Sequence, residues 1–78
     1  MWCVYGLLLN NGDIYKGCTN NIEGRLKKHR EGKVKCTALH LPFKFLFYVA
    51  LAERKKAFHF EKYLKSGSGR AFINRHFL

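Results

Sequence analysis

The sequence predicts a small single-domain protein of the α/β (α+β) class, in which a β-hairpin and a later strand form one sheet. Three observations support this prediction. Two short apolar runs flank Asn11-Gly12, and this arrangement is the strongest local signal for a hairpin. An aromatic run over 43–49 has the composition of a strand. The segments 21–31 and 53–65 place apolar residues at helical spacing.

Length and charge limit the class of protein. The chain has 78 residues, 47% of them apolar and 15% aromatic, so we expect one folded domain over residues 1–78. No apolar run approaches the roughly 20 residues of a membrane helix, and the N-terminus lacks a signal-peptide pattern. We therefore expect a cytoplasmic protein with no membrane partner. The formal charge of +10 favours nucleic acid as the partner.

The three cysteines predict neither a disulfide framework nor a zinc site. Cys3, Cys18 and Cys36 are odd in number and show no C-x-x-C spacing. The first two lie near the hairpin ends, where we expect small core residues. This usage indicates a reducing compartment.

The hairpin register decides whether its two tyrosines share a face. A two-residue loop would place Tyr5 and Tyr15 on opposite faces. A type I turn followed by a left-handed Gly12 would pair Leu9 with Asp13 and place both tyrosines on one face. Because glycine suits the left-handed conformation, we expect the second register.

The next helix is expected over 21–31, with Asn20 as its cap and an end before Gly32. Arg25 and His29 lie four residues apart on the stripe that also carries the apolar residues of this helix. Taken singly, each suits an edge or half-buried position. Taken together, beside the tyrosines, they favour contact with a phosphate.

Residues 32–42 form a basic connection without periodicity. Lys33 and Lys35 there suit either phosphate contact or solvent. Pro42 ends the connection, and the density of apolar residues in 43–49 predicts a buried third strand.

The second helix, 53–65, carries one acid on its apolar stripe. Glu61 follows Ala57 by four residues and precedes Leu64 by three. A carboxylate placed there needs a partner. That partner is either an ion pair with Arg25 or Lys65, or a divalent metal ion, since Mg²⁺ sites often use one carboxylate with water and substrate phosphate.

Residues 66–69 are expected to break that helix, and a short helix is expected from Arg70 to about Arg75. Asn74 within it suits either a site or an exposed position.

Several spaced motifs together resemble the GIY-YIG nuclease family, especially its small single-domain bacterial-type members. The resemblance covers Trp2 to Phe77. It rests on Tyr5, Tyr15-Lys16-Gly17-x-Thr19, Arg25-Leu26, His29, Gly32, Thr37, Pro42, and Glu61-Lys62-x-Leu64-Lys65-x-Gly67-x-Gly69-Arg70.

This resemblance implies a three-stranded antiparallel sheet flanked by helices and metal-dependent cleavage of DNA. It implies that Glu61 binds one divalent ion, Mg²⁺ or Mn²⁺, and that Tyr5 and Tyr15 lie near the attacking water. It also implies that Arg25 steadies the phosphate and that His29 assists a tyrosine or the proton transfer. Folding is therefore expected to bring these four side chains and Glu61 to one small hollow lined by cations. A tyrosine with a pKa of about 10 is a poor base, so nearby cations would have to favour its phenolate.

Several positions depart from the family pattern. The first tripeptide reads Cys3-Val4-Tyr5 or Val4-Tyr5-Gly6 in place of Gly-Ile-Tyr, although its tyrosine is present. Lys16 stands where an apolar residue is usual, so it either extends out of the core or touches DNA. Cys18 stands where some relatives have lysine. Asn74 corresponds loosely to a family asparagine. These departures bear on rate and substrate more than on fold. The sequence itself leaves open which tyrosine is the base.

The predicted function is a divalent-metal-dependent DNA endonuclease with structure-selective or weakly specific binding, because so small a domain has little surface for recognising sequence. The alternatives are a nucleic-acid-binding module with little cleavage activity and a basic structural protein. The oligomeric state is not predicted. The candidate DNA-binding residues are Lys16, Lys33, Lys35, Lys65 and Arg70.

Overall fold

The computed structural model describes all residues 1–78 and contains a three-stranded sheet with four helices. The elements are β1 (Trp2–Leu8), β2 (Ile14–Thr19), α1 (Ile22–Arg30), α2 (Lys35–Ala38), β3 (Lys44–Leu51), α3 (Arg54–Leu64) and α4 (Gly67–Phe77).

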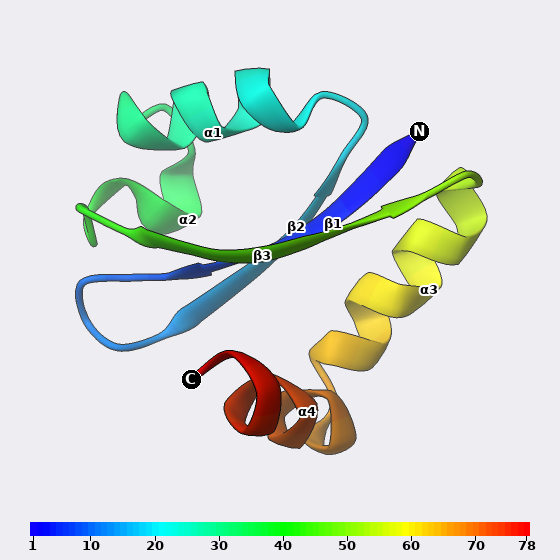
Figure 1. Cartoon of the computed structure of the whole chain (residues 1–78). Coiled ribbons are helices and arrows are strands. Elements are labelled where there is room, and N and C mark those ends of the chain that lie inside the picture. The colour runs from blue at the N-terminus through cyan, green and yellow to red at the C-terminus, as the bar shows by residue number, and fades with distance from the viewer.

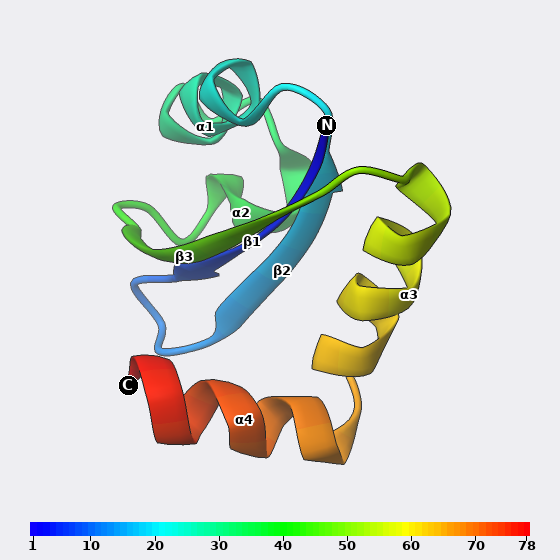
Figure 2. The same cartoon turned by 45° about the vertical axis from the view of Figure 1, so that its right-hand side comes forward.

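The sheet is antiparallel throughout and has the order β2-β1-β3. Helices α1 and α2 lie on one face, and α3 and α4 lie on the other (Figure 1 and Figure 2). This architecture confirms the predicted three-stranded antiparallel sheet flanked by helices. We call the two sides the α1 face, which carries Tyr5 and Leu7, and the α3 face, which carries Val4 and Gly6.

Each face of the sheet has its own core. Side chains alternate along a strand, so successive residues of β1 enter different cores. The core on the α1 face contains Tyr5, Leu7, Leu9 and Leu26. The core on the α3 face contains Val4, Phe47, Ala57, Leu64 and Ile73.

The hairpin has the expected register. The Leu9 amide donates to the Asp13 carbonyl at 2.8 Å, and Gly12, with φ of 89°, donates to the Leu9 carbonyl at 3.0 Å. Tyr5 pairs with Gly17, and Leu7 pairs with Tyr15. Tyr5 and Tyr15 therefore share the α1 face.

The boundaries of two helices differ from expectation. Asn21, not Asn20, caps α1, because its side-chain oxygen accepts from the Gly24 amide at 3.1 Å. The helix α3 ends at Leu64, as expected, but the break is shorter than 66–69 because α4 begins at Gly67 and not at Arg70. Gly69 lies in the first turn of α4, where a Cβ would collide with the backbone of Leu64.

The connection 32–42 and the third strand also differ from expectation. The connection contains the short helix α2, and the Leu41–Pro42 peptide bond that follows is cis. Strand β3 lies at an edge of the sheet, so the expectation of a buried strand is wrong for half of its side chains. No helix combines the length and the apolar character that crossing a bilayer requires.

Candidate active site

A glycine on β2 leaves room for the ring of Tyr5. Gly17 lies opposite Tyr5 across the β1–β2 ladder, and a Cβ at Gly17 would collide with the Tyr5 ring. The Tyr5 and Tyr15 rings lie 6.1 Å apart between centroids. The glycine that closes the Tyr15-Lys16-Gly17 motif is therefore needed for the position of Tyr5.

A chain of hydrogen bonds connects α1 to the tyrosines. His29 lies 2.8 Å from the Tyr5 hydroxyl through Nε2 and 2.8 Å from the Thr37 hydroxyl through Nδ1. The Thr37 hydroxyl donates to the Val34 carbonyl at 3.4 Å, so its oxygen accepts from Nδ1–H. This assigns Nε2 as the acceptor for the Tyr5 hydroxyl. Arg25 Nε then donates to the Tyr5 oxygen at 3.3 Å.

Burial keeps the ring and the phenol in this chain neutral. His29 is fully buried, and burial, with the charge of Arg25, lowers its pKa to about 4. Burial also raises the pKa of Tyr5 to about 12, although the hydrogen bond from Arg25 opposes the shift. The expectation that nearby cations favour a phenolate is therefore wrong for Tyr5, because desolvation outweighs them.

Tyr5, Tyr15, Arg25 and His29 form what we call the tyrosine cluster. Only part of this cluster can touch another molecule. Tyr5 and His29 are 0% exposed. Tyr15 and Arg25 are partly exposed, and Arg25 lines a polar cavity of about 290 Å³ beside Lys28. The hydrogen bond with Tyr5 is the main cause that raises the pKa of Arg25, so its guanidinium stays charged. The buried Tyr5 and His29 thus lie behind the two accessible groups, Tyr15 and Arg25.

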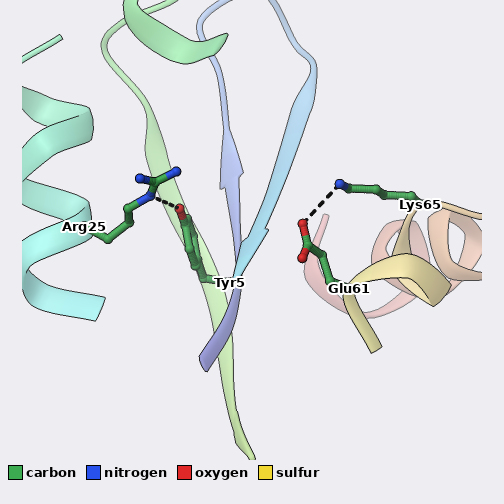
Figure 3. Close-up of polar contacts among 4 residues, drawn as sticks. All are labelled: Tyr5, Arg25, Glu61 and Lys65. Atoms are coloured by element: carbon green, nitrogen blue, oxygen red, sulfur yellow. Dashed lines mark hydrogen bonds and ion pairs between the residues drawn. The ribbon is translucent and has the colours of Figure 1, made fainter. Parts of the chain in front are cut away.

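The acid of α3 lies apart from this cluster, so the expectation that Glu61 shares one hollow with the tyrosines, Arg25 and His29 is wrong. Glu61 Oε2 pairs with Lys65 Nζ at 3.1 Å, the second of the two ion pairs considered for it. In Figure 3, strands β1 and β2 pass between the Tyr5–Arg25 pair and the Glu61–Lys65 pair. Burial and then the charge of Glu61 raise the pKa of the Cys18 thiol, which packs into the core of the α3 face. The carboxylate therefore lies beside β2 on the α3 face.

Most of the candidate DNA-binding cations lie on the same face as Glu61. Lys16 and Arg70 line a cavity of about 520 Å³ together with Asn74. Burial lowers the pKa of Lys16, and the charges of Arg70 and Lys65 lower it further. Lys16 is thus half-buried at the rim of this cavity and lies across the sheet from the tyrosines.

The two cations of the long connection are elsewhere. Lys33 pairs with Glu31 at 3.2 Å on the surface. Lys35 is exposed at the start of α2.

The donor set is sparse for a metal. No three His, Cys, Asp or Glu side chains lie together. Glu61 presents a partly exposed carboxylate with one oxygen, Oε1, outside its ion pair. One such oxygen suits Mg²⁺ or Mn²⁺ when water and a substrate phosphate complete the shell. It does not suit a metal that requires several protein ligands.

Sequence reasoning assigned no role to Thr37, although the motif contained it. A buried histidine needs partners for both ring nitrogens. That requirement indicates that a second polar residue exists, but Thr37 lies beyond the end of α1, in the short helix α2 that the sequence did not predict. Phe43, whose ring lies 6.0 Å from that of His29, closes another side of the imidazole.

Comparisons with known proteins agree with this geometry. The chain matches the family model described as the GIY-YIG catalytic domain over residues 1–75. It is 40% identical over 62 residues to a UPF0213 protein of Bacillus licheniformis, covering 78% of this chain and 64% of the relative. It is 36% identical over 62 residues to a UPF0213 protein of Lacticaseibacillus paracasei, covering 78% of this chain and 70% of that protein.

A solved structure shares the fold. The solution NMR structure of a UPF0213 protein from Bacillus halodurans is similar with a TM-score of 0.61 and 29% identity. The likeness covers 96% of this chain and 84% of the other. The match to the Bacillus licheniformis protein covers less than two thirds of that protein's length.

Proposed function

Because the chain belongs to the GIY-YIG nuclease family, we propose that it is a divalent-metal-dependent endonuclease that hydrolyses DNA phosphodiester bonds. The observation that carries this proposal is the support of Arg25 by a buried phenol. Tyr5 accepts from Arg25 Nε and is itself held by His29. Such a network fixes the side chain before substrate binds, as electrostatic stabilisation of a transition state requires.

Arg25 and Tyr15 are the groups of this cluster that we assign to the substrate. Both are partly exposed. A guanidinium matches two phosphate oxygens, and its charge stabilises the additional negative charge of the transition state. Tyr5 and His29 act through Arg25 and Tyr15 as positioning residues, because neither is accessible.

The hydrolysis step assigns the proton to Tyr15. An attacking water forms the new bond to phosphorus while the bond to the leaving oxygen breaks. The phenolate of Tyr15 takes the proton of that water, and the leaving oxygen takes a proton from solvent. Tyr15 takes this role rather than Tyr5 because it is partly exposed, whereas Tyr5 is fully buried.

Glu61 is the residue that we assign to the metal ion. A divalent ion at this position would neutralise phosphate charge and favour departure of the leaving oxygen. Although Glu61 and Tyr15 lie on different faces, β2 is an edge strand with no neighbour on its outer side. A DNA backbone lying along that edge would contact both faces.

On the α3 face, we assign binding of the DNA backbone to two lysines and one arginine. Lys16 and Arg70 line the cavity on the α3 face, and Asp13 is the one acid in its lining. Lys65 lies close enough to lower the pKa of Lys16 by its charge. These groups contact phosphates and carry no sequence information. We therefore propose structure-selective or weakly specific binding that weakens steeply with salt.

One observation favours a second candidate function. The ion pair of Glu61 with Lys65 occupies one carboxylate oxygen, and the acid lies across the sheet from Arg25. A nucleic-acid-binding module with little cleavage activity of its own would have this arrangement.

A nicking assay tests the proposal. Labelled flaps, forks, single strands and duplexes are incubated with Mg²⁺ or Mn²⁺, with EDTA as the control. Glu61→Ala, Arg25→Ala and Tyr15→Phe are expected to abolish nicking and leave binding in EDTA within a few fold. Glu23→Gln, which removes an exposed acid from α1, is the matched control for Glu61. Binding by the wild type without metal-dependent nicking would favour the module instead.

A further inference from the structure

Strand β3 contains an irregularity that changes which side chains share a face. Gly6 pairs with Phe47, but the next residue, Leu7, pairs with Phe45, so Leu46 is an extra residue in the ladder. Without the bulge, Phe45 and Tyr48 would face opposite sides, because their positions differ by an odd number. The bulge places both on the α1 face.

The two rings lie side by side and uncovered. Phe45 is 45% exposed and Tyr48 is 55% exposed, and the next residue on this face of the strand, Ala50, is also exposed. Their ring centroids are 6.1 Å apart, and the ring planes differ by 18°. By contrast, Phe47 on the other face is buried under α3 and α4. Helices α1 and α2 thus leave the outer row of β3 open.

From this arrangement we propose that Phe45 and Tyr48 form a stacking platform for the unpaired bases of single-stranded DNA. Nearly parallel exposed rings on a sheet match the flat faces of nucleobases, and such stacking tolerates any sequence. Tyr48 is the pairing partner of Tyr5 across β1 and β3, so the platform borders the tyrosine cluster. The inference deepens the proposed function, on which it rests, by naming unpaired DNA as the preferred substrate.

Charge favours a polyanion over a second copy of the chain on this surface. The segment from Gly32 to Ala52, which includes all of β3, contains Lys33, Lys35 and Lys44 and no Asp or Glu. The chain carries a formal charge of +10, so two copies would repel each other. A strand of phosphates with exposed bases matches both the apolar rings and the net positive charge of the chain.

Binding in EDTA tests the platform without any cleavage step. Fluorescence anisotropy is measured with a labelled 12-nucleotide oligothymidine and with an abasic oligonucleotide of the same length, which keeps the phosphates and lacks the bases. The wild type is expected to bind oligothymidine at least about tenfold more tightly than the abasic strand, since one stacked base contributes about tenfold or more. The double variant Phe45→Thr/Tyr48→Thr keeps β-forming residues and is expected to lose this difference.

Two further variants separate ring stacking from other effects. Tyr48→Phe keeps the ring and is expected to preserve the preference. Phe58→Ala removes a ring that is 43% exposed on α3, and it is expected to leave both affinities unchanged. Circular dichroism establishes that each variant is folded.

Several results would overturn the platform. These are equal affinity of the wild type for both strands, a parallel loss of both affinities in the double variant, or a dimer that the double variant disrupts while the preference for bases remains. The nuclease proposal is judged separately by nicking. A base preference that depends on Phe45 and Tyr48 without any nicking would preserve the platform and reject the nuclease, and the reverse result would do the opposite.

Discussion

Thr37→Val tests the hydrogen-bond chain beneath the candidate site. The substitution replaces a hydroxyl with a methyl group of similar size at a residue that is 0% exposed. It leaves His29 Nδ1–H without the partner that it now has at 2.8 Å. An unsatisfied buried donor costs about 1–3 kcal/mol. For a domain of this size, 2 kcal/mol corresponds to a decrease in melting temperature of roughly 8–16 °C.

Urea unfolding at pH 7, with a reductant present, measures this cost. Thr19→Val is the matched control, because Thr19 is the other threonine of the chain and is only half-buried. A double-mutant cycle with His29→Phe gives the coupling. In the His29→Phe background, which has no ring nitrogen opposite Thr37, Thr37→Val is expected to cost less stability than in the wild type. A wild-type cost below about 0.5 kcal/mol, or an equal cost in both backgrounds, would refute the assigned hydrogen bond.

Three further predictions concern the same framework. The pKa of His29 is lowered to about 4, so as pH falls the unfolded chain takes up the proton before the folded chain does. The free energy of unfolding should therefore decrease by about 3 kcal/mol between pH 6.5 and pH 4. Urea unfolding at several pH values measures this slope, which His29→Phe should remove. Asn21→Ala should cost about 1 kcal/mol of stability and Asn20→Ala much less, as compared by urea midpoints, and equal costs would contradict the assigned cap. Gly17→Ala should displace the Tyr5 ring, lower stability by about 1–3 kcal/mol and reduce nicking, and a variant with normal stability and nicking would contradict the need for glycine there.

The sequence predicted the hairpin and the tyrosine pair because those features depend on local chemistry. Asn11-Gly12 limits the turn geometry, and a period of two then determines which side of the strand carries each side chain. The stripe with Arg25 and His29 likewise follows from helical spacing. No long-range contact is needed for these expectations.

The remaining features depend on how distant segments pack. Composition indicated that 43–49 is a strand, but an apolar run does not distinguish a central strand from an edge strand with one covered face. The position of Glu61 depended on which face α3 would cover, and sequence spacing contains no such information. The pKa of Tyr5 was judged from its expected neighbours, whereas the degree of burial determined it.

Strand β2 carries residues for both sides of the sheet in strict alternation. Tyr15 and Gly17 serve one side, and Lys16 and Cys18 serve the other. One residue added to or removed from the loop at 10–12 would exchange these two sets while leaving a plausible hairpin. Homologous chains should therefore conserve the length of this loop, or change it only in steps of two.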